Sequence, residues 1–348
     1  MVRMSTVIHP MLPIVASAID GGMKIEIMQL SDDRTEEVNC YTFEQSTIAP
    51  ILAFHQKKPL LATASGQLHR TLEYARYSYL SPEVAIYQLS TDGTCENHQI
   101  ANLVGHGSPV TAISFCPDDD SEDSFNVATG DNNGDIRIWK IHVSMGSVEC
   151  VSFFKSPFRK PGFSISTYLI SSIHWLNQTK LVASHWNGCA KIIQYSESEK
   201  GFDVQPFSNT ETGIVKPFFK TETGILTCTG GNPSGEFFVT GGSGPEGGTI
   251  QVWSTKSLQP ICKLGSISSD IISMEYDATL GLIIVGCLKE VVIVRISPAG
   301  DEMHVLRRSA LHRRYVTTVA VHTVVTADGD ETLALSGTND RSLVFLKI

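Results

Sequence analysis

The 348-residue sequence lacks the features that mark membrane, secreted or metal-binding proteins. No apolar run approaches the roughly 20 residues that a transmembrane helix requires, so we do not expect a membrane protein. Its eight cysteines are scattered and form no C-x-x-C pair, which excludes the common zinc-binding spacings and does not resemble a secreted disulfide framework. We therefore expect a protein of the cytoplasm, the nucleus or both, with no bound metal.

The N-terminus also lacks a convincing leader. Arg3 and the apolar residues after it imitate a signal peptide, but His9, Pro10 and Pro13 interrupt the apolar run. The segment HPMLPIVASA that starts at His9 parallels HQKKPLLATA at residues 55 to 64, which indicates a repeated structural unit. We therefore expect the N-terminus to belong to the folded protein, and the protein not to be secreted.

Charged residues are scarce as well, at 18%, and the net charge is −9. A negative chain does not attract a phosphate backbone in general, so we expect no nucleic-acid binding by the chain itself. The hydrophobic content of 42% is sufficient for a packed core.

Motifs of catalysis are missing too. The sequence has no H-E-x-x-H and no G-x-S-x-G, and its acidic residues cluster in loops, which is typical of solvated surfaces. A formal G-x-G-x-x-G at residues 242–247 is followed by a strand pattern and contains Pro245, so no helix N-terminus is available for a pyrophosphate. We therefore expect a protein that is not an enzyme, with no catalytic, cofactor-binding or metal-binding residues.

What the sequence does have is one well-formed stretch, residues 105–141, which the rest of the chain repeats more loosely. The stretch starts with Gly-His, and apolar residues then alternate over Val110–Phe115. A second alternating segment covers Phe125–Thr129 and a third covers Ile136–Ile141. Alternation of period two, bounded by Gly, Asn and Asp turns, predicts antiparallel strands in a meander.

This stretch resembles the repeat of the WD-repeat family of β-propellers. His106, Thr129, Asn133 (in the place of the usual Asp) and Trp139 match that repeat, whereas Lys140 replaces the Asp of the Trp-Asp pair. The resemblance implies that the first four side chains form a hydrogen-bonded chain within a blade. A buried imidazole, hydroxyl and indole N–H each need a partner, so we interpret these residues as structural and not catalytic.

Seven copies of the pattern can be marked along the chain. The length also fits seven blades of roughly 40 to 45 residues each. Together these observations predict an all-β protein, a seven-bladed β-propeller of WD repeats that forms a single domain over residues 1–348. Segments between the copies, such as His98–Val104 and Pro260–Leu264, supply the fourth strand of a blade.

The seventh copy is the second best. His312 precedes its first strand as His106 does in the third copy, and Ser336 and Asp340 match Ser-Gly-x-x-Asp. No fourth-strand segment follows this copy, so the strand over residues 343–348 is closed by residues 1–4 or left open. An open edge can accept a strand from a partner, which we keep as a hypothesis.

Long loops rich in aromatic and basic residues fall on one face of the expected propeller, the top face, which carries the connections between copies and between second and third strands. Such residues dominate binding hot spots. The candidate partner-binding residues are Arg70, Tyr74, Arg76, Tyr77, Tyr79, Phe158, Arg159, Lys160, Phe218, Lys220, Arg313, Arg314 and Tyr315. Loops of the opposite face are acidic, for example residues 117–124. The other interpretation is that the top loops are merely solvated, with their aromatics packed on blade edges.

The resemblance implies a non-enzymatic scaffold or adaptor that holds partner proteins in a multiprotein complex, and the top face would bind their acidic or phosphorylated segments. Two alternatives stay open. Leu306-Arg307-Arg308-Ser309 faintly resembles the F/L-R-R-G motif of phosphoinositide-binding propellers, in which paired arginines bind phosphate. A propeller enzyme with residues gathered around the central channel would escape motif analysis.

Overall fold

The structure is a computed structural model of the chain. It describes residues 6–19, 22–31, 37–44, 51–64, 82–90, 98–117, 121, 123–155, 169–186, 188–196, 201–204, 207–208, 215–216, 219–220, 225–232, 234–244, 247–267, 270–277, 280–313, 315–326, 329–338 and 342–348. The regular elements in these ranges are all β-strands. This part of the chain therefore offers no helix long and apolar enough to cross a membrane.

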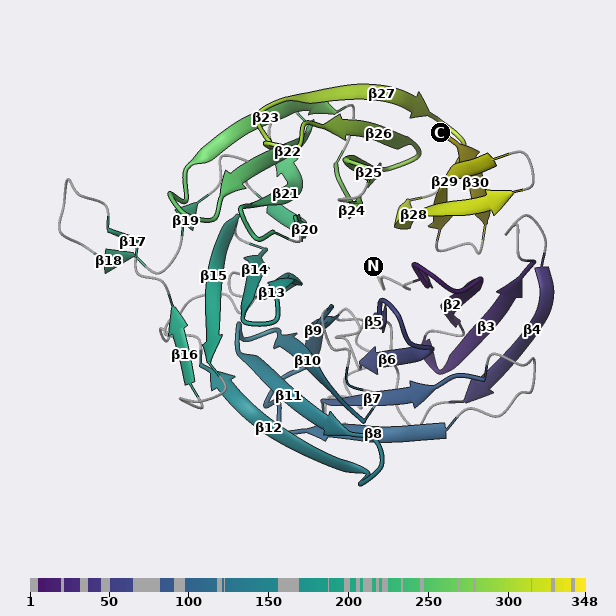
Figure 1. The fold of residues 1–348 in the computed structure, drawn as a ribbon, viewed down its shortest axis with the longest axis vertical. Coiled ribbons are helices and arrows are strands. Elements are labelled where there is room, and N and C mark those ends of the chain that lie inside the picture. Colours follow the sequence, from purple (N-terminus) through teal and green to yellow (C-terminus); the bar gives the residue numbers. More distant parts are fainter. Residues whose placement is uncertain are drawn as a thin grey trace, which may run out of the picture.

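The strands form seven antiparallel sheets, or blades, arranged in a ring (Figure 1). The first three blades consist of β1 (Thr6–Ile8), β2 (Ile14–Ile19), β3 (Lys24–Leu30) and β4 (Glu37–Glu44); β5 (Ile51–Phe54), β6 (Leu60–Ala64), β7 (Glu83–Gln88) and β8 (His98–Val104); and β9 (Val110–Phe115), β10 (Ser124–Asp131), β11 (Ile136–His142) and β12 (Ser147–Phe154). Each blade starts with its innermost strand and ends at the rim. The predicted seven-bladed β-propeller is confirmed.

The remaining four blades follow the same order. They consist of β13 (Ile170–Asn177), β14 (Lys180–His185), β15 (Cys189–Ser196) and β16 (Gly201–Val204); β20 (Ile225–Gly231), β21 (Phe237–Gly244), β22 (Gly247–Ser254) and β23 (Pro260–Ile267); β24 (Ser273–Asp277), β25 (Leu282–Gly286), β26 (Val291–Ile296) and β27 (Met303–Ser309); and β28 (Val316–Thr326), β29 (Gly329–Thr338) and β30 (Leu343–Lys347). A small hairpin, β17 (Phe207–Ser208) with β18 (Val215–Lys216), lies outside the ring in Figure 1.

The fourth blade builds its outer edge from two segments. β16 pairs with the second half of β15, and β19 (Phe219–Lys220) pairs with the first half at Cys189 and Ala190. The sequence predicted that Phe218 and Lys220 lie in a top-face loop. Instead, the chain leaves the rim after β16, forms the β17–β18 hairpin, and returns through β19 to complete the blade.

Apolar clusters between neighbouring blades hold the ring together. One cluster bridges each of the seven pairs of adjacent blades, including the pair formed by the last and the first. Between the third and fourth blades, for example, Ile136 and Ile138 pack with Ile170 and Trp175. Because alternate residues of a strand point to opposite faces of its sheet, each strand contributes to the clusters on both sides.

The glycine after Thr129 is explained by this packing. A Cβ atom added to Gly130 would lie 2.7 Å from Ile170 Cγ2 and 2.8 Å from Ile173 Cδ1, both on the innermost strand of the next blade. The Thr-Gly pair therefore combines a polar group for its own blade with the space that the following blade occupies.

Two histidines stabilise the first turns of the first two blades. His9 Nδ1 accepts the main-chain N–H groups of Met11 and Leu12 at 3.1 and 2.9 Å, and His55 Nδ1 accepts those of Lys57 and Lys58 at 3.0 and 3.1 Å. His9 Nε2 then donates to Lys58 O at 2.9 Å, which links the two blades. The sequence parallel between residues 9–18 and 55–64 thus corresponds to one repeated turn.

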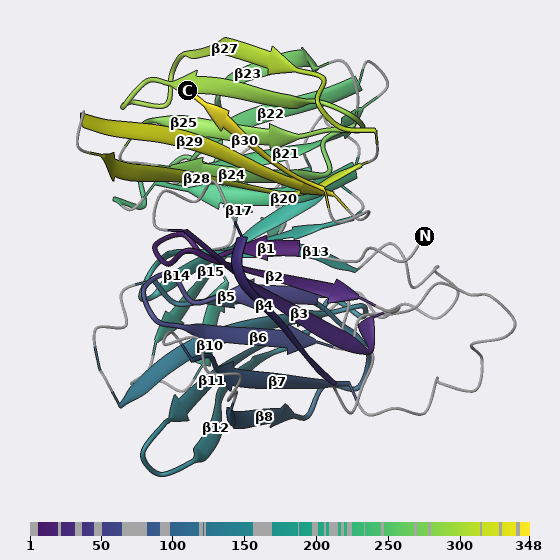
Figure 2. The same ribbon diagram turned by 90° about the vertical axis from the view of Figure 1, so that its right-hand side faces the viewer.

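The ring closes where the first blade meets the seventh. In Figure 2, β1–β4 lie beside β28–β30. Ile8 and Val15 pack there against Ala320, Leu333 and Leu335. The described part of the seventh blade has three strands, with β30 outermost. Residues 1–4, which could have supplied a fourth strand, lie outside the described residues.

Candidate functional site

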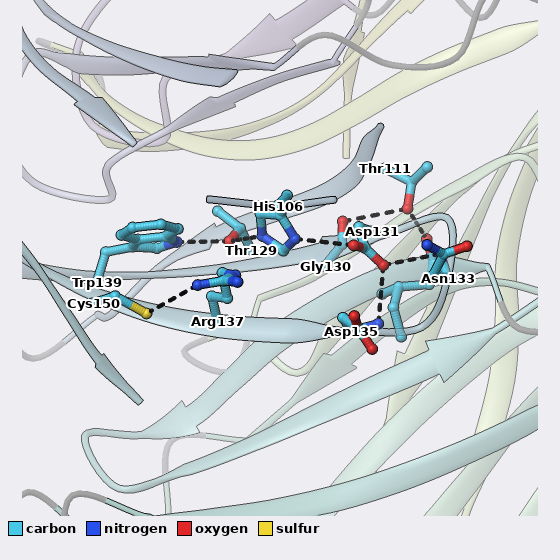
Figure 3. A network of polar contacts seen from close by, with 11 residues as sticks. His106, Thr111, Thr129, Gly130, Asp131, Asn133, Asp135, Arg137, Trp139 and Cys150 are labelled. Atoms are coloured by element: carbon cyan, nitrogen blue, oxygen red, sulfur yellow. Dashed lines mark hydrogen bonds and ion pairs between the residues drawn. The ribbon is translucent and has the colours of Figure 1, made fainter. Parts of the chain in front are cut away.

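A chain of buried polar side chains runs through the third blade (Figure 3). His106 Nε2 lies 2.7 Å from Thr129 Oγ1, and Trp139 Nε1 donates to the same oxygen at 2.8 Å. His106 Nδ1 lies 3.1 Å from Asp131 Oδ2. One proton arrangement satisfies every group: the indole N–H donates to Thr129, whose hydroxyl donates to Nε2, while Nδ1–H donates to the carboxylate. These hydrogen-bonded side chains therefore have a structural role.

Asp131, and not the predicted Asn133, supplies the acidic member of this chain. The second carboxylate oxygen of Asp131 accepts the main-chain N–H groups of Asn133 and Asp135, each at 2.9 Å. Asn133 thus takes part through its main chain. The sequence did contain a signal for Asp131, because it is an acidic residue at the start of a Gly-containing turn. In such turns the Asp side chain commonly accepts a hydrogen bond from the main chain two residues later.

Two other blades, the seventh and the fifth, keep shorter versions of this hydrogen-bonded chain. In the seventh blade His312 Nε2 lies 2.8 Å from Ser336 Oγ, as predicted, and Nδ1 lies 3.3 Å from Ser342 Oγ. Asp340 lies outside the described residues. In the fifth blade Trp253 Nε1 donates to Thr240 Oγ1 at 3.0 Å.

Most predicted partner-binding residues fall outside the described part of the chain. These are Arg70, Tyr74, Arg76, Tyr77, Tyr79, Phe158, Arg159, Lys160, Phe218 and Arg314. Lys220 belongs to β19, so it lies on a strand and not in a loop. Arg313 and Tyr315 follow the buried His312 on the connection between β27 and β28. Arg313 is exposed and Tyr315 is half-buried.

The structure does show where two of the predicted loops are anchored. The first of these loops, residues 66–83, ends at Glu83, which pairs with Val104 on the rim strand of the second blade. The second loop, residues 155–167, begins directly after Phe154, at the end of the rim strand of the third blade. Between these points, a Cβ added to Gly105 would lie 3.2 Å from Arg137 Nη1, so the chain crossing between blades runs beside Arg137.

We call the surface where the second and third blades meet the 2–3 rim. It consists of Val104, Gly105, Arg137, Trp139, Cys150 and Phe153, and Arg137 is its positively charged residue. Its guanidinium carbon lies 4.3 Å from the centre of the Phe153 ring and 5.8 Å from that of Trp139. Nη1 donates to Cys150 Sγ at 3.6 Å, a weak acceptor, and Nε is buried without a hydrogen-bond partner among the described residues. No carboxylate of the described residues forms an ion pair with this guanidinium.

The 2–3 rim also exposes apolar surface. Val104 is 56% exposed and Phe153 is 43% exposed, although both are large apolar side chains. A planar guanidinium stacked on an aromatic ring and bordered by apolar groups is suited to bidentate recognition of a carboxylate or phosphate. None of the rim residues was among the predicted partner-binding residues, and only Trp139 was singled out at all, as a structural residue, because Arg137 sits in a strand and Phe153 lies 16 positions later.

Arg307 and Arg308, the predicted phosphate pair, do not converge. They are neighbours on β27 and point to opposite faces of the sixth blade. Arg307 Nη1 donates to Lys347 O at 2.9 Å, whereas Arg308 Nη1 lies 3.9 Å from Glu290 Oε1. Two arginines arranged in this way cannot clamp one phosphate.

No cluster of three or more His, Cys, Asp and Glu side chains in the described ranges could hold a metal ion. That observation concerns metal sites alone. Catalysis in the central channel therefore stays an open alternative that an activity assay on the purified chain would test.

Comparison with known proteins agrees with the fold. Residues 97–140 match the family model of the WD domain, G-beta repeat; this range covers the rim strand β8 of the second blade and the strands β9, β10 and most of β11 of the third. A chain in the crystal structure of the mitotic checkpoint complex superposes with a TM-score of 0.65 at 13% identity, covering 96% of this chain and 87% of that one. Sqt1 of Saccharomyces cerevisiae gives a TM-score of 0.64 at 13% identity, with coverages of 97% and 81%. No curated protein sequence matches the chain.

Proposed function

We propose that this WD-repeat β-propeller is a non-enzymatic scaffold that binds an acidic or phosphorylated segment of a partner protein at the 2–3 rim. The observation that carries the proposal is the Arg137 guanidinium, which is stacked on Phe153 and lacks a carboxylate partner among the described residues. A partly buried cation in this state gains from an anionic group brought by a partner, because charge-assisted hydrogen bonds are the stronger ones.

The predicted top-face loops fit the same proposal. Residues 66–83 and 155–167 end and begin, respectively, at the 2–3 rim, and their sequences contain Arg76, Tyr77, Arg159 and Lys160. Basic and aromatic residues of this kind suit a partner segment that carries several anionic groups. The blades that hold these strand ends are packed on both sides, so the strands lose little conformational freedom when a partner binds.

The similar structures are compatible with such a role. One of them is a chain of the mitotic checkpoint complex, an assembly of several proteins. At 13% identity this likeness concerns the fold, so the partner of this chain must come from experiment.

The test is quantitative affinity purification, from cells, of the full wild-type chain and of three variants. Arg137→Gln keeps a polar side chain, although a shorter one, and removes the positive charge, and we expect it to lose at least one partner of the wild-type protein. Arg308→Gln is the matched control, since it removes an arginine of a distant blade. A combined Tyr77→Ala, Arg159→Ala and Arg314→Ala variant tests the loops.

The purified partner then decides the chemistry. Peptides from its acidic or phosphorylated segments should bind the wild-type chain and bind Arg137→Gln at least about tenfold more weakly, which corresponds to about 1.4 kcal/mol. If Arg137→Gln and the triple variant retain every partner at wild-type amounts, the proposal is wrong.

A further inference from the structure

The connection between the sixth and seventh blades carries side chains that the equivalent connection before the third blade lacks. There the buried His106 has a glycine on either side, and a Cβ added to the second of them, Gly107, would meet nothing within 4 Å. His312 occupies the same place before the seventh blade, and its neighbours are Leu311 and Arg313. Positions that are glycine in one connection thus carry large side chains in the other.

His312 fixes where these two side chains lie. Its Nε2 is 2.8 Å from Ser336 Oγ and its Nδ1 is 3.3 Å from Ser342 Oγ, and the residue is only 6% exposed. With the imidazole held inward, both of its neighbours lie on the surface, since Leu311 is 47% exposed and Arg313 is exposed as well. The buried polar group therefore anchors a leucine and a cation at the surface.

The hairpin turn between β25 and β26 adds a second pair of exposed residues. Cys287 N–H donates to Glu290 O at 2.9 Å, which places Leu288 and Lys289 at the tip of the turn. Leu288 is 38% exposed and Lys289 is exposed too. This pair repeats the composition of the first, an apolar side chain next to a cation.

Main-chain hydrogen bonds join the turn to the connection. His312 N–H donates to Lys289 O at 3.3 Å, and Val316 N–H donates to Cys287 O at 3.0 Å. The two exposed pairs therefore form one surface. It belongs to the top face, because it combines a connection between blades with a turn between second and third strands. We call this surface the 6–7 patch, and it consists of Leu288, Lys289, Leu311 and Arg313.

The 6–7 patch is positively charged. Within the described ranges neither Lys289 nor Arg313 forms an ion pair. The carboxylate of the same turn belongs to Glu290, whose Oε1 lies 3.9 Å from Arg308 Nη1 and is thus directed to a different cation. A ligand that complements the patch therefore carries acidic groups for the two cations and an apolar group for the two leucines.

We propose that the 6–7 patch binds a short segment of a partner protein in which a large apolar residue is flanked by acidic ones. The apolar side chain covers Leu288 and Leu311, and the acidic groups pair with Lys289 and Arg313. The hydrogen bonds described above hold these side chains' segments in place before the partner arrives, so binding orders little of this chain. The patch lies across the ring from the 2–3 rim (Figure 1), and it stands independently of the function proposed above.

An anionic membrane is the other surface that attracts leucines and cations together, and the patch suits it less well. Each of the two leucines is more than half covered by its own chain. Only two cations accompany them, whereas basic clusters that bind anionic lipids have about four to eight. A peptide segment, by contrast, matches a surface of this size.

Selection from a displayed library of random peptides on the immobilised full chain tests the proposal. We expect the enriched peptides to share an apolar residue between acidic ones. A resynthesised peptide should bind the double variant Leu288→Ser, Leu311→Ser at least about tenfold more weakly than the wild type. The double variant Lys289→Gln, Arg313→Gln should weaken binding to a similar degree and reduce its dependence on salt. All four side chains are exposed, so we expect these variants to fold, which urea denaturation checks.

Matched variants show whether the effect is local. Met145→Ser removes an apolar side chain that is 67% exposed in a turn of the opposite face. Arg295→Gln removes an exposed cation near the other end of β26. Both variants should bind the selected peptides as the wild type does.

Three outcomes would overturn the proposal directly: no enriched peptide, enriched peptides without acidic residues, or equal binding to the wild type and to both double variants. Peptides whose binding is lost only in Arg137→Gln would belong to the 2–3 rim and would likewise reject the 6–7 patch. Vesicles of phosphatidylserine and phosphatidylcholine provide the last comparison. Vesicle binding that requires Leu288 and Leu311, without any selected peptide, would assign the patch to a membrane instead.

Discussion

The hydroxyl of Thr129 carries two hydrogen bonds of the third blade, so its removal measures what the buried polar chain contributes to stability. Thr129→Val replaces the hydroxyl by a methyl group of similar size and leaves the β-branched shape intact. His106 Nε2 and Trp139 Nε1, at 2.7 and 2.8 Å from the oxygen, then both lose their partner. Each buried polar group left without a partner costs about 1 to 3 kcal/mol, so we expect a loss of about 2 to 6 kcal/mol in the free energy of unfolding.

The fifth blade contains the matched control. Thr240 is as fully buried as Thr129 and faces Trp253, but no histidine bonds to its hydroxyl in the described residues. Thr240→Val therefore leaves the Trp253 indole N–H without a hydrogen-bond acceptor and should lower the free energy of unfolding by about 1 to 3 kcal/mol. Urea denaturation followed by tryptophan fluorescence compares the two variants with the wild type, provided that the slope with urea stays the same. A Thr129→Val cost equal to or below that of Thr240→Val would refute the view that His106 depends on this hydroxyl.

Two further predictions concern pH. Lys191 is fully buried, and burial lowers the pKa of its amino group to about 7; the unfolded chain therefore binds more protons between pH 7 and 10.5, and stability rises with pH over that range. Lys191→Met should raise the free energy of unfolding at pH 7 by roughly 4 kcal/mol and remove the rise of stability with pH. An unchanged pH dependence in this variant would show that Lys191 is not its source. Burial also lowers the pKa of His55 to about 4, so stability should fall as pH drops from 6.5 toward 4, by roughly 2 kcal/mol. In His55→Phe this decrease of stability at acidic pH should be smaller. The variant should also be less stable at pH 7, because the main-chain N–H groups of Lys57 and Lys58 lose their acceptor. A decrease at acidic pH equal to that of the wild type would exclude His55 as its source.

The strands could be predicted closely because alternation is a property of the sequence itself. The expected segments Val110–Phe115 and His98–Val104 are the observed β9 and β8. Blade boundaries were harder where a strand is assembled from distant segments. β19 is only two residues long and pairs with a strand about 30 positions earlier, so no local sequence pattern could predict it.

The polar chain was predicted in outline but not in its acidic member. His106, Thr129 and Trp139 hold the expected places, yet the carboxylate comes from Asp131. A repeat pattern fixes spacing along the chain, whereas the partner of an imidazole depends on which side chain the turn directs back toward it. Asp131 ends β10, so its side chain points back to His106, while Asn133 lies in the turn beyond.

The candidate site escaped prediction for a different reason. Hot-spot composition drew attention to loops, where aromatic and basic residues are dense in the sequence. The Arg137–Phe153 stack comes from two neighbouring strands, whose register opposes these residues across the sheet. Only the pairing of β11 with β12 reveals that the guanidinium lies on an aromatic ring and donates a hydrogen bond to the Cys150 sulfur.

Trp139 connects the stability of the third blade to the proposed binding site. Its indole N–H is held by Thr129 in the polar chain, and its ring lies 5.8 Å from the Arg137 guanidinium, on the side of the 2–3 rim. A stacked guanidinium keeps its orientation only while the rings beneath it are fixed, and orientation determines bidentate recognition. Thr129→Val releases the indole without touching the rim surface. Under conditions in which this variant is fully folded, it should therefore weaken any partner that depends on Arg137, whereas Thr240→Val should leave that partner unaffected.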